Sequence, residues 1–221
     1  MKIIAHIRTD FPSKFGIPRQ SGLIPSLEGM IVFEPEYRNE DAIRGLEGFS
    51  YLWLIWKFSE SILETWSPTV RPPKLGGNVR MGVFATRSPF RPNPIGLSSV
   101  KLDKTETDTE LGPVLFVSGA DLMDGTPIYD IKPYIPFTDS HPDAIGGFAD
   151  EHKDDYLTVN FPSELLCLIP PEKQETLKSV LALDPRPSYQ NDPERIYGLE
   201  FAGFDIRFNV NEQELTVCDV K

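Results

Sequence analysis

The sequence predicts a mainly β fold, with an all-β barrel or sandwich followed by a small α+β domain. Two observations predict it. Short apolar runs alternate with turn residues through the first half, and a strand, a helix and a hairpin follow a polar stretch near the end. Strand–helix alternation and a GxGxxG fingerprint are both missing from the sequence, so a Rossmann-type core is not expected.

The strands expected in the first half are short apolar runs bounded by turn residues. They cover residues 3–8, 30–33, 49–58, 81–86, 97–102, 114–118 and 128–131. The run 49–58 contains Trp53 and Trp56 and suits a buried central strand, where core packing is a better interpretation of both rings than cofactor stacking. One helix is expected over 39–46, because Asn39 can cap it and Gly45 can stop it.

The second half changes character at residues 138–155, which are rich in Asp, Gly and His and are expected to form an exposed loop. A strand is expected over 156–161, and a helix over 171–183 that places Leu177, Val180 and Leu181 on one face. A closing hairpin joins residues 206–210 to 215–220. The predicted domains are therefore 1–142 and 156–221.

The composition excludes several classes of protein. No apolar run approaches the length of a membrane helix, and residues 1–12 lack the apolar core of a signal peptide, so a cytoplasmic protein is expected. Two cysteines and three histidines are scattered without metal-ligand spacing, so neither a metal site nor a disulfide framework is expected.

Charge is unevenly distributed along the chain. The net charge is −11, yet residues 65–102 contain six basic residues and no acidic one. A phosphate backbone responds to the local potential within about 8–10 Å rather than to the total charge. A basic face on an acidic body is therefore predicted, although arginines scattered over the surface are the plainer interpretation.

The most unusual segment is residues 82–97, a strand end followed by a loop with three prolines. Each proline fixes φ, so the loop should hold Arg87 and Arg91 in place at a low entropic cost. A guanidinium group there could bind a carboxylate or a phosphate in a two-pronged fork. The alternative is a rigid edge with solvated arginines.

Three further segments carry candidate chemistry. Residues 119–134 bring acids and a lysine close together around an Asp-Gly-Thr-Pro turn, and residues 16–22 form a short loop after the first strand. The loop 184–189 offers Arg186 as a cation and Tyr189 as a stacking surface for a single-stranded nucleotide. Ordinary turn chemistry and a rigid helix stop are the alternatives.

Together these segments resemble the TsaA-like, or TrmO, family of tRNA methyltransferases. The matching stretches are residues 18–22, 42–50, 80–96, 124–127 with 130–134, and 184–189. The resemblance implies a closed, non-Rossmann β-barrel methyltransferase that works as a homodimer. It further implies that S-adenosylmethionine donates a methyl group to N6-threonylcarbamoyladenosine, beside the anticodon of threonine tRNA.

The resemblance also implies the site residues. Cofactor contacts map onto Gln20, Ser21, Gly22, Ser59, Glu60, Arg87, Leu97, Ser118, Gly119, Ala120, Asp121, Leu122 and Met123. The predicted substrate or tRNA contacts follow instead from the chemistry of the side chains and are Arg91, Asn93, Lys132, Arg186 and Tyr189. A group that takes the acceptor proton is needed, and Asp121, Asp130, Asp139 and a water molecule all remain candidates.

Two other functions stay open from the sequence. One is a non-catalytic RNA-binding barrel, in which Arg87 and Arg91 only bind phosphate. The other is a methyltransferase that uses the same cofactor on an anionic small molecule.

Overall fold

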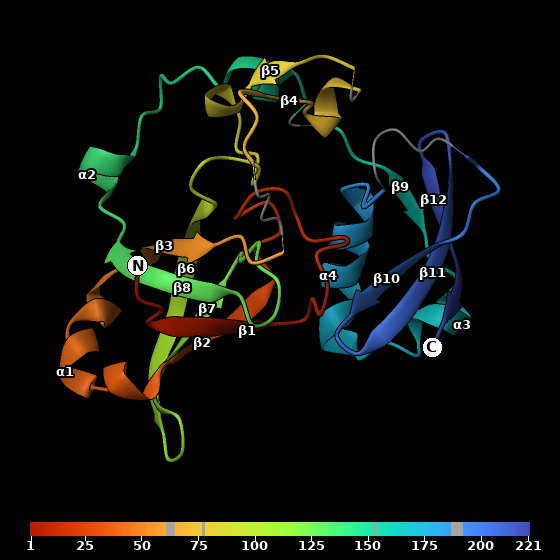
Figure 1. The fold of residues 1–221 in the computed structure, drawn as a ribbon. Coiled ribbons are helices and arrows are strands. Elements are labelled where there is room, and N and C mark those ends of the chain that lie inside the picture. The colour runs from red at the N-terminus through yellow and green to blue at the C-terminus, as the bar shows by residue number, and fades with distance from the viewer. Residues whose placement is uncertain (61–64, 77, 153, 187–191) are drawn as a thin grey trace.

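The first half of the chain closes into a β-barrel in a computed structural model, which describes residues 1–60, 65–76, 78–152, 154–186 and 192–221. Neighbouring strands of the barrel are antiparallel, and the predicted closed barrel is confirmed (Figure 1). Its order around the barrel is β1 (Ala5–Thr9), β2 (Glu28–Phe33), β7 (Gly112–Ser118), β6 (Ile95–Asp108), β3 (Tyr51–Lys57) and β8 (Pro127–Pro133).

The barrel interior is filled by alternate residues of each strand, because successive side chains of a strand point to opposite faces. In β3 the inward residues are Leu52, Leu54 and Trp56, all at most 7% exposed. The indole of Trp56 needs a glycine on the neighbouring strand, since a Cβ on Gly96 would lie 2.2 Å from its Cε2 atom. The prediction of a core strand over 49–58 is therefore confirmed for Trp56, but it is wrong for Trp53, which lies on the outward face of β3 and donates from Nε1 to Asp139.

Short helical segments connect β2 to β3. They are η1 (Pro35–Tyr37), α1 (Glu40–Ile43) and η2 (Leu46–Gly48). The side chain of Asn39 accepts a hydrogen bond from the Asp41 amide at 2.9 Å, as expected of a cap. The expected helix over 39–46 is too long, because α1 ends at Ile43, the backbone of Arg44 is no longer helical, and Gly45 follows with φ of +85°.

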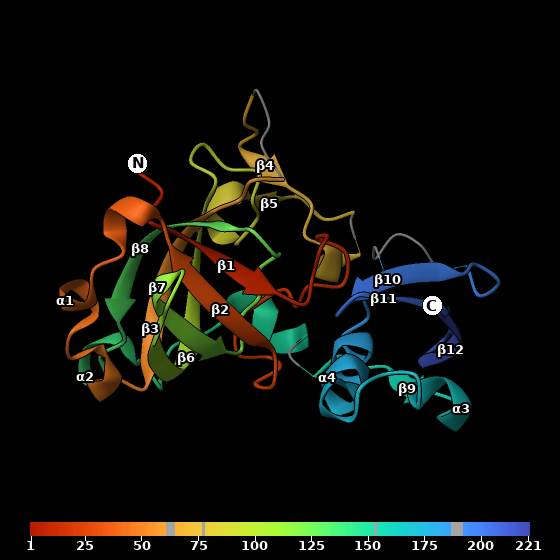
Figure 2. The same cartoon turned by 90° about the horizontal axis from the view of Figure 1, so that it is seen from below.

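A small lobe is inserted between β3 and β6, and we call residues 65–76 and 78–86 the β4–β5 lobe. It contains β4 (Thr69–Val70), η3 (Pro73–Leu75), β5 (Met81–Gly82) and η4 (Val83–Ala85). Two views at right angles set it apart from the barrel strands (Figures 1 and 2). The strand expected over 81–86 is wrong beyond Gly82, because Thr86 turns back to donate its amide to the Val83 carbonyl.

The second half of the chain forms a mixed sheet of order β10-β11-β12-β9, in which only β12 and β9 are parallel. The predicted helix is confirmed and packs its apolar face into the core of this domain. Strand β10 was not expected from the sequence. The elements are α2 (Pro136–Asp139), η5 (Gly147–His152), β9 (Thr158–Asn160), α3 (Ser163–Leu166), α4 (Pro171–Ala182), β10 (Tyr197–Phe201), β11 (Phe204–Asn211) and β12 (Glu214–Val220).

The second core also contains residues from the beginning of the chain. Phe11, Ile24 and Leu27 are at most 3% exposed and pack among the apolar side chains of residues 157–220. We call residues 10–27 the bridging segment, because it leaves β1, enters the second core and returns to β2. Lys173 of α4 forms an ion pair with the first residue of this segment, with Nζ 2.7 Å from Asp10 Oδ2.

Two classes of feature are missing from the part of the chain that the structure describes. None of its helices is long and apolar enough to cross a membrane. In the same residues no three His, Cys, Asp or Glu side chains gather in a way that could hold a metal ion.

Candidate active site

Two loops meet beside the barrel, and both carry predicted cofactor residues. The Gly22 amide of the bridging segment donates to the Gly119 carbonyl, after β7, at 2.9 Å. Both glycines have positive φ, which side chains rarely adopt. A Cβ on Gly119 would lie 3.4 Å from the Gly22 backbone, so two glycines allow this close approach.

The bridging segment is also attached to β6. The pairing of β6 with β7 ends at Lys101, so the backbone edge of β6 is open from there towards Ile95. The hydroxyl of Ser21 occupies this edge and accepts a hydrogen bond from the Ser99 amide at 3.1 Å. The position of Ser21 is therefore fixed by the barrel rather than left to a mobile turn.

The proline-rich loop brings Arg87 to the same place. Arg87 Nη1 donates to Gln20 Oε1, although the two residues are far apart in the sequence. Arg91 has a different task, because its Nη1 donates to the carbonyls of Thr86 and Ser88 at 3.1 and 3.3 Å and holds the loop in shape. Arg87 is exposed, which leaves its guanidinium accessible to an anion.

Asp121 lies at the centre of this arrangement. Its Oδ1 atom accepts a hydrogen bond of 2.5 Å from Ser98 Oγ, and Ser98 Oγ accepts one of 2.9 Å from Trp56 Nε1. Burial raises the pKa of the Asp121 carboxyl, while the Ser98 hydroxyl and the charge of Arg87 oppose the rise. A carboxylate with a raised pKa is a stronger base than an ordinary aspartate.

The remaining predicted cofactor residues lie around this centre in different ways. Leu97 is on the outer face of β6 and is 56% exposed, which offers an apolar surface to a ligand. Ala120 and Leu122 face the barrel core, so only their backbone groups are available. Three other predicted residues make hydrogen bonds within the protein. The Ser118 hydroxyl donates to Asp103. The carbonyls of Met123 and Glu60 accept from Thr126 and Lys14, respectively. Ser59 is half-buried after β3.

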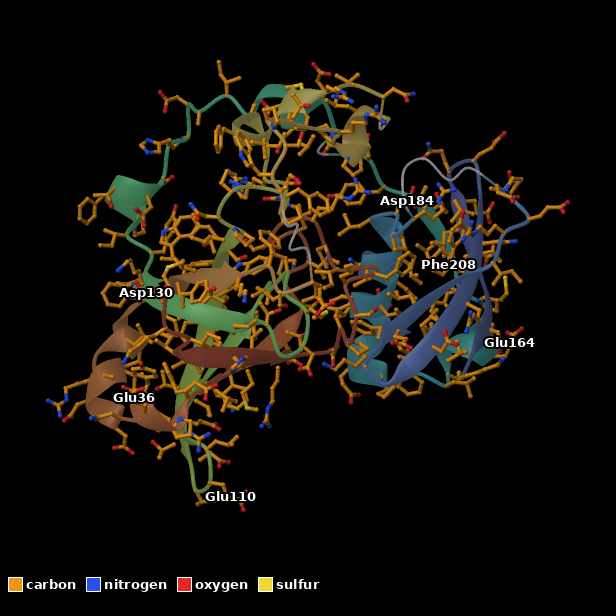
Figure 3. All side chains as sticks on the ribbon, viewed as in Figure 1. Glu36, Glu110, Asp130, Glu164, Asp184 and Phe208 are labelled. Atoms are coloured by element: carbon orange, nitrogen blue, oxygen red, sulfur yellow. The ribbon has the colours of Figure 1, made fainter. Side chains whose placement is uncertain are left out.

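The other two candidate bases are held elsewhere. Asp130 is on β8 of the barrel (Figure 3), and its Oδ2 atom lies 2.9 Å from Nζ of Lys132. Asp139 accepts hydrogen bonds from the Ile135 amide and from Trp53 Nε1, both at 2.9 Å, and these lower its pKa. Asp139 is therefore a weaker base than Asp121, whose pKa is raised.

The predicted tRNA residues are spread over both domains. Asn93 is exposed in the proline-rich loop. Arg186 forms a two-pronged ion pair with Asp184 at 2.8 and 2.9 Å, and only 10% of its side chain is exposed. Figure 3 places Asp184 in the second domain. The described residues do not include Tyr189.

Sequence reasoning missed Ser98 and Ser99, which position Asp121 and Ser21. One signal was available for Ser98. It occupies an inward position of β6 between Gly96 and Val100 and is 1% exposed, and a buried hydroxyl needs a partner. The partner could not be identified, because Asp121 belongs to another part of the chain.

Comparisons with known proteins agree over nearly the whole chain. A family model described as the tRNA-methyltransferase O N-terminal domain matches residues 6–140, and one described as the TrmO C-terminal domain matches residues 157–221. Over 217 residues the chain is 44% identical to a tRNA (adenine(37)-N6)-methyltransferase of Escherichia coli strain K12, covering 95% of this chain and 92% of the relative.

A putative S-adenosylmethionine-dependent methyltransferase RcsF of Pseudomonas aeruginosa is 38% identical, covering 98% of this chain and 95% of the relative. The crystal structure of TrmO from Pseudomonas aeruginosa superposes with a TM-score of 0.74 at 33% identity. That superposition covers 99% of this chain and 97% of the other.

Proposed function

Since the chain belongs to the tRNA-methyltransferase O family, we propose that it transfers a methyl group from S-adenosylmethionine to the N6 atom of adenosine 37 in tRNA. The observation that carries the proposal is the match of both family domains, together with the convergence of Gln20, Arg87, Gly119 and Asp121 at one place. The acceptor that we propose is the N6-threonylcarbamoyl form in threonine tRNA.

The residues present fit such a cofactor. S-adenosylmethionine combines a carboxylate, two cationic groups and an apolar ring, so its site needs a cation, an anion and an apolar surface. Arg87 is an exposed cation, Asp121 is a half-buried anion and Leu97 is an exposed apolar side chain. The Gly22–Gly119 contact provides backbone that a ligand can approach closely, since nothing lies within 4 Å of the position of a Cβ on Gly22.

When bound, the cofactor supplies an electrophilic methyl group on a sulfonium. The residues of the chain have to hold the acceptor nitrogen in line with that methyl group, at about 3–3.5 Å, which alone contributes about 7–11 kcal/mol. The acceptor nitrogen loses its proton as it gains the methyl group, and we assign Asp121 Oδ as the acceptor of that proton. An anticodon-loop base is already unpaired, which lowers the cost of presenting it.

The other predicted contacts enter as parts of the same proposal. Arg91 or Lys132 would bind the threonyl carboxylate, and Asn93 would contact the acceptor or its backbone. Arg186 and Tyr189 would contact tRNA from the second domain, provided that Arg186 exchanges Asp184 for a phosphate. The domains 1–142 and 156–221, a homodimer and a cytoplasmic location complete the proposal.

The function is tested with labelled S-adenosylmethionine and threonine tRNA, prepared with and without the threonylcarbamoyl group. We expect label at adenosine 37 of the modified tRNA only. Label in neither tRNA would reject the proposal. Salt-dependent tRNA binding without cofactor affinity would then support a non-catalytic barrel, whereas cofactor affinity with no need for tRNA would support a small-molecule methyltransferase.

Arg87→Ala is expected to weaken S-adenosylmethionine binding by roughly 10-fold or more, because a charged hydrogen-bond donor is lost. Isothermal titration calorimetry with the cofactor measures this directly. Arg44→Ala is the matched control, since Arg44 is an exposed arginine at the end of α1, paired with Asp41. Equal affinities of the two variants would contradict the role of Arg87.

A further inference from the structure

The β4–β5 lobe carries a pair of aromatic rings that the methyl-transfer site does not use. We propose that Trp66 and Phe84 form a stacking platform for an unpaired tRNA base that neighbours the methylated nucleotide. The inference rests on the proposed function, because it names the part of the chain that receives the RNA. Under this inference the two residues bind the tRNA base and take no part in methyl transfer.

The rings lie face to face on the surface of the lobe. Their centroids are 6.3 Å apart and their planes differ by 29°. Trp66 is 52% exposed and Phe84 is 73% exposed. Single exposed apolar residues are ordinary, but two large rings that stack on each other and still face solvent form one continuous apolar surface. Such a surface suits the flat face of a nucleobase.

The backbone that carries Phe84 is fixed. Val83, the neighbour of Phe84, is 1% exposed, and its amide donates to the Pro68 carbonyl at 2.9 Å. Thr86 closes the turn from the other side, with its amide and its hydroxyl both donating to the Val83 carbonyl. Because Phe84 sits on this closed turn, little entropy is lost when a base stacks on it.

The charge around the rings selects the kind of partner. Arg71 and Arg80 are exposed on the same lobe, and no acidic residue occurs from residue 65 to residue 102. Exposed aromatic rings among cations are the usual combination in proteins that bind single-stranded nucleic acid. An apolar protein partner would not need the cations, so a loop of RNA is the occupant that the surface fits.

The platform is also close to the proposed site of methyl transfer. Phe84 is three residues before Arg87 in the chain, which limits their Cα separation to about 11 Å. A nucleotide adjacent to the reacting one can span a distance of this order. The flanking nucleotide would therefore stack on the lobe while the target base reaches Arg87 and Asp121.

The test is the affinity of the full chain for fluorescein-labelled threonine tRNA, measured by anisotropy at several salt concentrations. Phe84→Ala and Trp66→Ala are each expected to weaken binding about 10-fold, with no change in the slope of log affinity against log salt. Phe84→Tyr keeps a ring and should bind like the unmodified chain, whereas Phe84→Leu keeps only apolar bulk and should bind like Phe84→Ala.

Two matched variants separate stacking from charge and from general exposure. Arg80→Ala should reduce the salt slope by about 1, as expected for one lost phosphate contact. Phe137→Ala removes an aromatic ring that is 88% exposed on α2, outside the lobe, and should leave affinity unchanged. Cofactor affinity should be unchanged in Phe84→Ala, which shows that the fold and the cofactor site are intact.

Several outcomes would overturn the platform. Unchanged tRNA affinity in the Phe84→Ala, Trp66→Ala double variant is one, and full binding by Phe84→Leu is another. A change of oligomeric state in that double variant, seen by sedimentation velocity, would show that a second copy covers the rings. If the unmodified chain methylates tRNA and these variants bind tRNA as tightly as it does, only the platform fails. If the unmodified chain binds tRNA through the two rings but never methylates it, only the proposed function fails.

Discussion

Asp121→Asn is expected to lower kcat by about 10²- to 10⁴-fold, the usual contribution of a positioned general base. Asparagine keeps the shape of the side chain and can still accept the hydrogen bond from Ser98, so the loss reports the missing negative charge. Single-turnover methylation of modified tRNA, with saturating cofactor, separates this effect from cofactor binding.

The pH dependence gives a second readout. A base accepts a proton only in its ionised form, so the proposed role predicts that the rate falls as pH falls through the pKa of Asp121. Because burial raises that pKa, the fall should occur at a higher pH than an ordinary aspartate would give. Ser98→Ala removes a hydrogen bond that lowers the pKa, so it should move the fall to a still higher pH.

Stability should change in the opposite direction to activity. A carboxyl whose pKa is raised in the folded state stabilises the fold below its unfolded pKa, and loses this contribution as pH rises through the folded value. At neutral pH the burial of the ionised Asp121 therefore works against folding, and Asp121→Asn should melt at a higher temperature than the unmodified chain.

Asp130→Asn is the matched control for the assignment of the base, because Asp130 is an outer carboxylate paired with Lys132. It should retain most of the activity. Loss of activity in Asp130→Asn, with normal turnover in Asp121→Asn, would transfer the role to Asp130. Normal turnover in both variants would leave the proton to water or to Asp139.

Local patterns in the sequence predicted much of the fold. The alternation in Tyr51–Lys57 places three side chains in the barrel, the helix over Pro171–Ala182 buries its apolar face, and the resemblance to the TrmO family is confirmed. The strand and the helix depend on neighbours within one element, so periodicity and capping residues reveal them, whereas the family was indicated by the resemblance of whole stretches of sequence.

Contacts between distant segments could not be predicted in the same way. The meeting of Gly22 with Gly119, the bond from Ser98 to Asp121 and the entry of Phe11 into the second core each join parts of the chain with no local signal in common. In residues 81–86 local alternation was misleading, because a backbone turn around Val83 determines the structure there. The positions of the site residues therefore depend on contacts between distant parts of the chain, which local patterns do not reveal.

Phe201→Ala is expected to destabilise the protein by about 3–5 kcal/mol and also to weaken cofactor binding, although Phe201 belongs to β10 of the second domain. Its side chain is fully buried and packs edge-on against Phe11, with ring centroids 5.3 Å apart. Phe11 is the second residue of the bridging segment, which also carries Gln20, Ser21 and Gly22. A cavity at Phe201 should therefore loosen the loop that contacts Arg87.

Phe208→Ala is the control that separates these two effects. Phe208 is equally buried in the same core (Figure 3), but its ring stacks on Tyr197 at 5.6 Å instead of on the bridging segment. Chemical denaturation should show a comparable loss of stability in both variants. Below the unfolding transition, calorimetry should show weaker S-adenosylmethionine binding in Phe201→Ala than in Phe208→Ala, because Phe201 has the ring contact with Phe11. Equal affinities of the two variants for S-adenosylmethionine would mean that the barrel alone holds the bridging segment in place, through Ser21 and Gly22.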